Sequence, residues 1–278
     1  MPRYLSDEQV AFFRSQGYAY PFDAIDKQQA VRLRALIEDY ERQSGHDANR
    51  TLKIKGHLAF PALVELGRNP RILDAVQDLI GPNILLFGAS IFAKDGGDPR
   101  YVSWHQDSAY FGLSPHEEVT AWVGLTDATE QNGCLRVLPG SHVGPDYRHE
   151  ETYAPDNMLA KGQSLLGIDE SLAVSMPVEA GQFSLHHERT AHSSLPNRSG
   201  GRRIGFAFFY IPTHVKSLKG RGQATLVRGV DEYGYWDPDV LPGRDLDPAA
   251  MRQLQAAWGS YKDGKVLQAA DMAGQAAG

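Results

Sequence analysis

Short β-prone runs closed by turn-forming residues fill the chain from Asn83 to Pro212 and constrain its fold more than any other feature. Tight turns are expected at Asn132–Gly133, Pro139–Gly140 and Ser199–Gly201, where they would join runs into antiparallel pairs. The number of runs fits a β-sandwich or barrel. The runs are ILLFGASIF, TAWVGLTD, CLRVLPGS, GQFSLHHE and RIGFAFFYIP.

Helical spacing marks both ends of the chain. Ser6 is placed to cap a first helix, and apolar residues recur every three or four positions from Lys27 to Gln43. Pro70–Leu79 and Met251–Trp258 have the same pattern, whereas the Ala-, Gly- and Gln-rich end of the chain is expected to fray. These patterns predict a mainly β fold with flanking helices, of the α+β class.

Composition and charge narrow the class of partner. The formal net charge is −6 and no dense block of Lys and Arg occurs, which argues against nucleic acid or an anionic membrane. No stretch approaches the ~20 apolar residues of a membrane span, and the first residues lack the pattern of a signal peptide. One cysteine, Cys134, excludes an internal disulfide and is typical of a reducing compartment. We therefore predict a cytoplasmic protein that binds a small molecule.

A polar, irregular segment lies between Gly144 and Val174. It is longer than the ~12–15 residues typical of a passive connection. We predict that residues 145–173 form a lid over a binding site.

The stretch WHQDSAYFGL contains the first chemical signal. On a strand, residues two apart share a face, so His105 and Asp107 are expected to point to the same side. An imidazole and a carboxylate suit a divalent metal. A second histidine would complete the two-histidine, one-carboxylate triad of non-haem ferrous oxygenases, which leaves coordination positions open.

The chain has ten histidines, and the nine besides His105 compete for the third position. His142 follows a turn that it could brace, and His116 lies in a loop or helix start. The run LHHERTAHSS offers His186, His187 and His192, of which we select His192. Four others occupy polar or loop-like contexts in which a solvated role is expected: His46, His57, His149 and His214.

The choice of His192 depends on the strand that follows it. If the chain reverses around residues 196–201, antiparallel pairing would bring Arg203 across from His192. Arg203 shares its face of the strand with the small residues Gly205 and Ala207, which leave room for a ligand. The opposite face carries the packing residues Ile204, Phe206 and Phe208.

An arginine that points into a cavity requires an anion, and a dicarboxylic cosubstrate can supply a bidentate partner. Two alternatives stay open. Arg203 could pair with a surface acid such as Glu188, and a register slip of one residue would exchange it with Arg202.

Three motifs in order carry a resemblance: HQD at 105–107, NGCLRVLPGSH at 132–142 and HSSLPNRSGGRR at 192–203. They closely resemble the phytanoyl-CoA dioxygenase family of Fe(II)/2-oxoglutarate-dependent oxygenases. The resemblance implies a double-stranded β-helix, also called a cupin-like jelly roll. It further implies that His105, Asp107 and His192 are the catalytic residues and metal ligands. Arg203, favoured over Arg202 by the family spacing, would hold the distal carboxylate of 2-oxoglutarate.

The resemblance extends to residues around the cosubstrate. It implies that Ser194 and Trp122 lie beside 2-oxoglutarate, although Ser194 could be only a turn residue and Trp122 only a core residue. Lys94 is expected to bind the cosubstrate too, with Ser90 and Gln106 also lining the pocket. One dioxygenase domain is expected over residues 1–278, with a helical part at about 1–80, a jelly-roll core at about 83–215 and a C-terminal extension at about 216–278.

The activity that follows is hydroxylation of an unactivated C–H bond of a small, polar metabolite, with consumption of O2 and release of succinate and CO2. Desaturation and halogenation are alternatives, but the related carrier-protein-dependent halogenases lack the carboxylate that Asp107 supplies. A cupin-like binding protein without turnover is the alternative from another class. A CoA- or carrier-bound substrate is compatible with the sequence, which does not indicate an oligomeric state.

Overall fold

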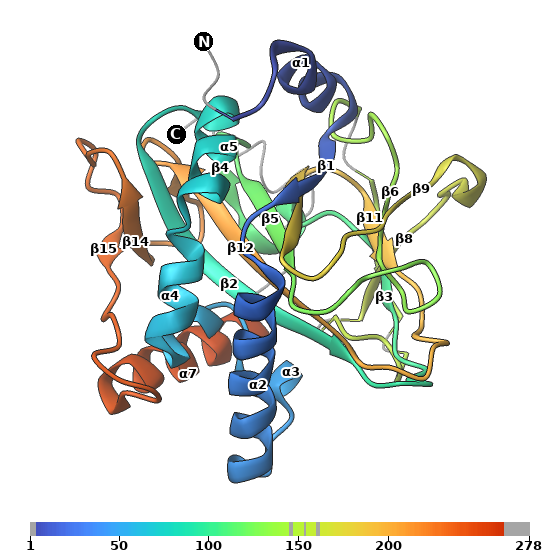
Figure 1. The fold of residues 1–278 in the computed structure, drawn as a ribbon. Helices are drawn as coiled ribbons and strands as arrows, with labels where there is room; N and C mark the ends of the chain where they lie inside the picture. The colour runs from blue at the N-terminus through green and yellow to red at the C-terminus, as the bar shows by residue number, and fades with distance from the viewer. Residues whose placement is uncertain (1–3, 145–146, 153, 160–161, 264–278) are drawn as a thin grey trace.

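Two β-sheets that face each other form the centre of the molecule (Figure 1). The computed structural model describes residues 4–144, 147–152, 154–159 and 162–263. The large sheet has the strand order β1-β10-β5-β12-β2-β14-β15 and is antiparallel except between β14 and β15. Its strands are β1 (Tyr18–Asp23), β2 (Ile84–Lys94), β5 (Val119–Gly124), β10 (Gln182–His187), β12 (Arg203–Pro212), β14 (Gln223–Arg228) and β15 (Asp237–Pro238).

The small sheet has the order β3-β11-β6-β9. Its strands are β3 (Val102–His105), β6 (Leu135–Val137), β9 (Val174–Met176) and β11 (His192–Ser194). Along the chain the core strands alternate between the large sheet (β2, β5, β10, β12) and the small sheet (β3, β6, β9, β11), except that the consecutive strands β6 and β9 both belong to the small sheet. This alternation confirms the predicted double-stranded β-helix. Two short pairs flank it: β4 (Leu113–Ser114) with β13 (Lys216–Ser217), and β7 (His149–Glu151) with β8 (Gln163–Leu165).

Helices cover the face of the large sheet that points away from the small sheet (Figure 1). Outward residues of β12, Ile204, Phe206 and Phe208, pack with Leu63 and Ile72 of these helices in one buried core. The predicted two-residue alternation along β12 is therefore correct.

Along the described part of the chain, the helices are α1 (Asp7–Gln16), α2 (Lys27–Ser44), α3 (Ala48–Thr51), α4 (Pro61–Gly67), α5 (Pro70–Ile80), α6 (Ser108–Phe111) and α7 (Pro248–Asp263), with 3-10 turns η1 (Gly56–Ala59) and η2 (Glu170–Leu172).

The predicted helical segments form, and their ends follow local chemistry. Ser6 caps α1 in a reciprocal capping box with Gln9. The predicted Met251–Trp258 helix lies within α7, and the part of the C-terminal tail beyond residue 263 lies outside the described residues. Within the described ranges, no helix combines the length and apolarity that a membrane span requires.

The described parts of the predicted lid are more ordered than the sequence indicates. They contain β7, β8 and η2, and they contact β3, the strand that ends at His105. The Ser103 hydroxyl donates to the Gln163 carbonyl, and the Asn157 side-chain amide donates to the Ser103 oxygen at 2.9 Å. This segment therefore lies against the strand that leads into the candidate site.

Candidate active site

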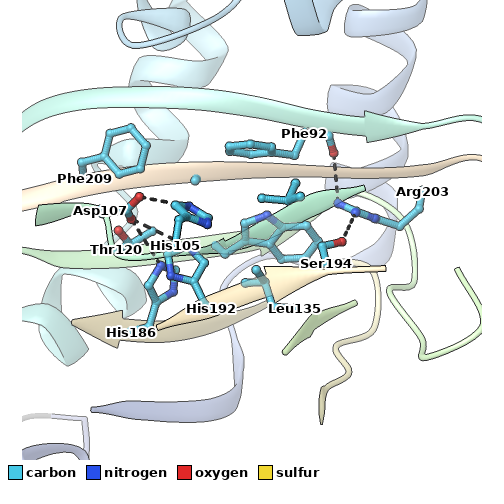
Figure 2. Close-up of a pocket in the computed structure, with 13 residues that line it drawn as sticks. Phe92, His105, Asp107, Thr120, Leu135, His186, His192, Ser194, Arg203 and Phe209 are labelled. Atoms are coloured by element: carbon cyan, nitrogen blue, oxygen red, sulfur yellow. Dashed lines mark hydrogen bonds and ion pairs between the residues drawn. The ribbon is translucent and has the colours of Figure 1, made fainter. Parts of the chain in front are cut away.

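His105, Asp107 and His192 meet at one end of the space between the two sheets (Figure 2). Their ligand atoms all lie within 4.8 Å of one another. His105 and His192 face each other across the β3–β11 pair. Asp107 does not share the strand with His105, as the two-residue spacing predicted. The strand ends at His105, and Asp107 precedes α6 in helical conformation.

The two histidines are oriented by backbone carbonyls. Nδ1 of His105 lies 2.9 Å from the backbone carbonyl oxygen of Ser103, and Nδ1 of His192 lies 2.9 Å from the backbone carbonyl oxygen of Thr190. A ring nitrogen that faces a carbonyl carries the proton, which leaves the Nε2 lone pair directed toward Asp107.

Charge at this end also suits a metal. Burial, together with His105 and His186, keeps the pKa of His192 well below its usual value, so this imidazole is neutral. Burial alone would raise the pKa of Asp107, but the neighbouring imidazoles His192, His105 and His186 outweigh it and hold the pKa well below its usual range. Two imidazoles and one carboxylate form a donor set that fits Fe(II).

A cavity extends from this triad between the sheets. The triad lies at one end of it and Arg203 at the other (Figure 2). Its lining is Phe92, Val102, His105, Asp107, Thr120, Trp122, Leu135, His186, His192, Ser194, Arg203, Ala207 and Phe209.

Arg203 is a fully buried guanidinium held by neutral groups. It donates to the Ser194 hydroxyl at 3.0 Å and to the Phe92 carbonyl at 3.2 Å, and it lies 5.4 Å from the ring centre of Trp122. Burial lowers its pKa to about 10, so it stays charged at neutral pH. Among the described residues, no carboxylate lies within ion-pair distance of it. Gly205 makes the arrangement sterically feasible, because a Cβ there would lie 1.8 Å from the Trp122 ring.

Lys94 lies behind Ser194 and is not among the residues that line the cavity. Its ammonium donates to the Ser194 hydroxyl at 2.7 Å and to the Ser194 and Leu195 carbonyls. The Ser194 hydroxyl in turn donates to the Gly133 carbonyl at 2.7 Å. The Ser194 oxygen therefore accepts from Lys94 and Arg203 together. Burial lowers the pKa of Lys94 to about 6.

Two other predicted pocket residues also lie outside the cavity lining. The Ser90 hydroxyl accepts from the Ile54 amide at 2.8 Å. The Gln106 side chain donates to the Arg189 carbonyl and accepts from the Tyr147 amide at 3.2 Å. Both residues fix neighbouring backbone instead.

The strand register points Arg203, and not Arg202, into the cavity, but the strand pairing predicted to bring it there was wrong. Arg202 points outward and forms ion pairs with Glu41 at 2.7 Å and Asp95 at 2.9 Å. Arg203 does not pair with His192. It pairs with Lys94 across β12 and β2, while His192 belongs to the other sheet. Arg203 and His192 thus lie on different sheets and at opposite ends of the cavity.

Local sequence context gave wrong predictions for the environment of several other side chains. His57 and His149, expected in solvent, are both buried, and Glu188 is a buried residue rather than a surface acid. Glu188 lies beside another buried carboxyl group, Glu118, and mainly burial raises the pKa of both. His186, which was weighed and set aside, lines the cavity beside the triad. Alternation along GQFSLHHE was the available signal, because Phe183 and Leu185 belong to the outward core.

Comparisons with known proteins agree with this geometry. Residues 13–205 match the family described as phytanoyl-CoA dioxygenase. A probable alpha-ketoglutarate-dependent hypophosphite dioxygenase of Stutzerimonas stutzeri is 32% identical over 219 residues, which cover 77% of this chain and 73% of that protein.

Solved structures give the same result. The apo structure of the non-heme monooxygenase ThoJ has a TM-score of 0.80 at 31% identity, with 92% of this chain and 97% of that chain covered. CytC3 with Fe(II) and alpha-ketoglutarate has a TM-score of 0.66 at 25% identity, with 87% and 96% covered.

Proposed function

The chain belongs to the phytanoyl-CoA dioxygenase family, and from this premise we propose that it hydroxylates an unactivated C–H bond of a small, polar metabolite. Its class is that of the Fe(II)/2-oxoglutarate-dependent oxygenases, which use Fe(II), 2-oxoglutarate and O2. In the overall reaction R–H, 2-oxoglutarate and O2 give R–OH, succinate and CO2. We further propose that residues 1–278 act as one catalytic domain.

In this proposal the triad holds the metal. His105 and His192 would bind Fe(II) through Nε2, and Asp107 through one carboxylate oxygen. Bound with its cosubstrate, Fe(II) supplies the activation of O2 that C–H oxidation requires. The chain's own contribution is to fix three ligands on one side, leave coordination positions open and keep the site buried.

The single observation that carries the proposal is the buried guanidinium of Arg203 at the far end of the cavity. It has neutral hydrogen-bond partners and no counter-ion in the described part of the chain. A buried cation of this kind requires an anion. The distal carboxylate of 2-oxoglutarate would supply it, with Ser194 and Trp122 beside it and Lys94 acting indirectly through Ser194.

Asp107 supports hydroxylation over halogenation. In a carrier-dependent halogenase, chloride needs the position that a carboxylate occupies in a hydroxylase. Here a carboxylate lies 3.4 Å from His105 and 3.9 Å from His192, so the position is filled. Polar groups beside the triad, Thr120 and His186, support a substrate with hydrogen-bonding groups.

A substrate panel tests the proposal. The purified protein would be incubated aerobically with Fe(II), 2-oxoglutarate and small polar metabolites, with hypophosphite and acyl-CoA thioesters included, and succinate and product mass would be measured. We expect stimulated succinate formation together with a product that gains one oxygen atom. Exclusive turnover of acyl-CoA or hypophosphite would refute the substrate class, and a chlorinated product would refute hydroxylation.

The Asp107→Gly variant sharpens this test. Loss of the carboxylate should weaken Fe(II) and 2-oxoglutarate binding and reduce hydroxylation steeply. Efficient chlorination is not expected, because the groups that would place chloride were not selected here. Unchanged hydroxylation by this variant would contradict the role of Asp107.

A further inference from the structure

His186 is a third imidazole beside Asp107. It lies on β10 opposite Thr120 of β5, and its ring lies 4.4 Å from the ring of His192 (Figure 2). Only 2% of the residue is exposed. It lines the cavity and is therefore part of the site without being one of the three grouped ligands.

The two oxygens of Asp107 have different neighbours. Oδ1 lies 3.4 Å from Nε2 of His105, whereas Oδ2 lies 3.7 Å from Nε2 of His186 and 3.9 Å from Nε2 of His192. One oxygen can therefore face a metal while the other faces His186. A small rotation of the carboxylate closes the 3.7 Å separation to a hydrogen bond.

The proton positions distinguish His186 from the two ligands. In His105 and His192, Nδ1 faces a carbonyl and keeps the proton, so Nε2 is a lone pair. Neither ring nitrogen of His186 has a hydrogen-bond partner within the described ranges. Nothing holds its proton on Nδ1, so Nε2 can carry it toward Asp107.

The other polar neighbour at this end cannot take this role. The Thr120 hydroxyl donates to Glu118 at 2.8 Å, so its hydrogen is already used. We propose that His186 is a positioning residue whose Nε2–H donates to the Asp107 oxygen that does not bind the metal. The inference rests on the proposed function, because it takes His105, Asp107 and His192 as the metal site.

In this role His186 would control whether Asp107 binds the metal through one carboxylate oxygen or through both. A carboxylate with one oxygen held by a donor presents the other oxygen alone. Without the donor it is free to rotate and to bind through both oxygens, which would fill a position that the cosubstrate needs. Loss of such outer partners typically costs about 10–100-fold in metal affinity.

Titration of the purified, metal-free protein with Co(II) alone tests the proposal without any substrate. Calorimetry gives the affinity, and the visible absorption of Co(II) reports its coordination. We expect His186→Phe to weaken Co(II) binding about tenfold and to change the absorption spectrum. His186→Gln, which restores an N–H donor, should stay within about threefold of the wild type. Ser184→Ala changes the same face of β10 and should bind Co(II) as the wild type does.

Four outcomes would overturn the proposal. Wild-type affinity and spectrum in His186→Phe would remove any role toward Asp107. Equal weakening in His186→Gln and His186→Phe would indicate packing rather than donation. A loss in His186→Phe as complete as that in His105→Ala would make His186 a ligand. Stoichiometric Co(II) binding by His105→Ala would instead refute the metal site itself, and the positioning role with it.

Discussion

Two of the buried clusters of charged side chains in the described part of the chain differ in whether the chain itself balances the charge. Behind η1, Lys55 lies 2.9 Å from Asp239, and both are buried. The Thr225 hydroxyl donates to the same carboxylate at 2.8 Å, and the Gln253 amide donates to it at 2.5 Å. In the cavity, by contrast, Arg203 has only neutral partners.

The difference separates a structural cluster from a binding cluster. The Lys55–Asp239 cluster joins residues 184 positions apart and attaches β14 and α7 to η1, so its free energy belongs to the fold. In the function proposed above, a cation at the triad and an anion at Arg203 complete the cavity cluster. Removing a residue from the first should cost stability, and removing one from the second should cost ligand binding.

The largest effect is expected at the triad. His105→Ala or His192→Ala should abolish stoichiometric Fe(II) binding, because each leaves two ligands, while the thermal midpoint of the metal-free protein changes little. Anaerobic titration with Fe(II) measures the stoichiometry, and the wild type, which should bind one ferrous ion per chain, is the reference. Stoichiometric iron retained by both variants would refute the assignment of the two histidines as ligands, and with it the contrast between the two clusters.

In the structural cluster, Lys55→Met should lower the free energy of unfolding by about 3–5 kcal/mol, since it leaves a buried carboxylate without its cation. The affinity of the folded protein for 2-oxoglutarate should not change. Chemical denaturation measures the loss. Lys27→Met, which removes an exposed pair with Glu179, is the control and should cost less than ~1 kcal/mol.

The pH dependence of stability distinguishes the clusters again. Burial alone would raise the pKa of Asp239, but Lys55 and His57 outweigh it and lower the pKa to about 2. Against an unfolded value of ~3.9, this contributes about 2–3 kcal/mol that is present above pH ~4 and lost as pH falls toward ~2. Denaturation at a series of pH values should show this loss in the wild type. An equal loss in Asp239→Asn would assign it to other groups.

The sequence predicted the parts of the site that depend on local alternation. The two-residue period of β12 separated Arg203 from the packing face of Phe206. This property is set by neighbours along the chain, so a single sequence contains it. The triad was selected by the resemblance of three motifs to a family, because the same period wrongly placed Asp107 on the strand of His105.

Pairings between distant segments were not predictable in the same way. His57 is buried because residue 239 packs against it, and no local pattern signals a contact across so many positions. Lys94 was expected at the cosubstrate, but its three hydrogen bonds go to Ser194 of the opposite sheet and to Leu195, the residue after it. Which sheet a strand joins determines what its polar side chains contact, and that follows from the complete fold.

Arg203 provides the next prediction. Arg203→Ala should raise the dissociation constant for 2-oxoglutarate at least tenfold, because a lost charge-assisted bond costs roughly 1.5–3 kcal/mol and ~1.4 kcal/mol is tenfold. Arg202→Ala, which removes a partly exposed arginine outside the cavity, is the matched control. A larger effect in the control would move the binding role to the other register.

The smallest effect is expected at Lys94, and it tests whether this buried lysine belongs to the cavity or to its support. Lys94 reaches Arg203 only through the shared Ser194 oxygen, so Lys94→Met should weaken 2-oxoglutarate binding roughly threefold, within the ~0.5–1.5 kcal/mol of one hydrogen bond. If the action is indirect, Lys94→Met should have no further effect in the Arg203→Ala background, since coupled residues are not additive. Calorimetric titration of the two single variants and the double variant gives the coupling. Additive losses would show that Lys94 contacts the cosubstrate itself, and Lys94 would then join the unbalanced charges of the cavity.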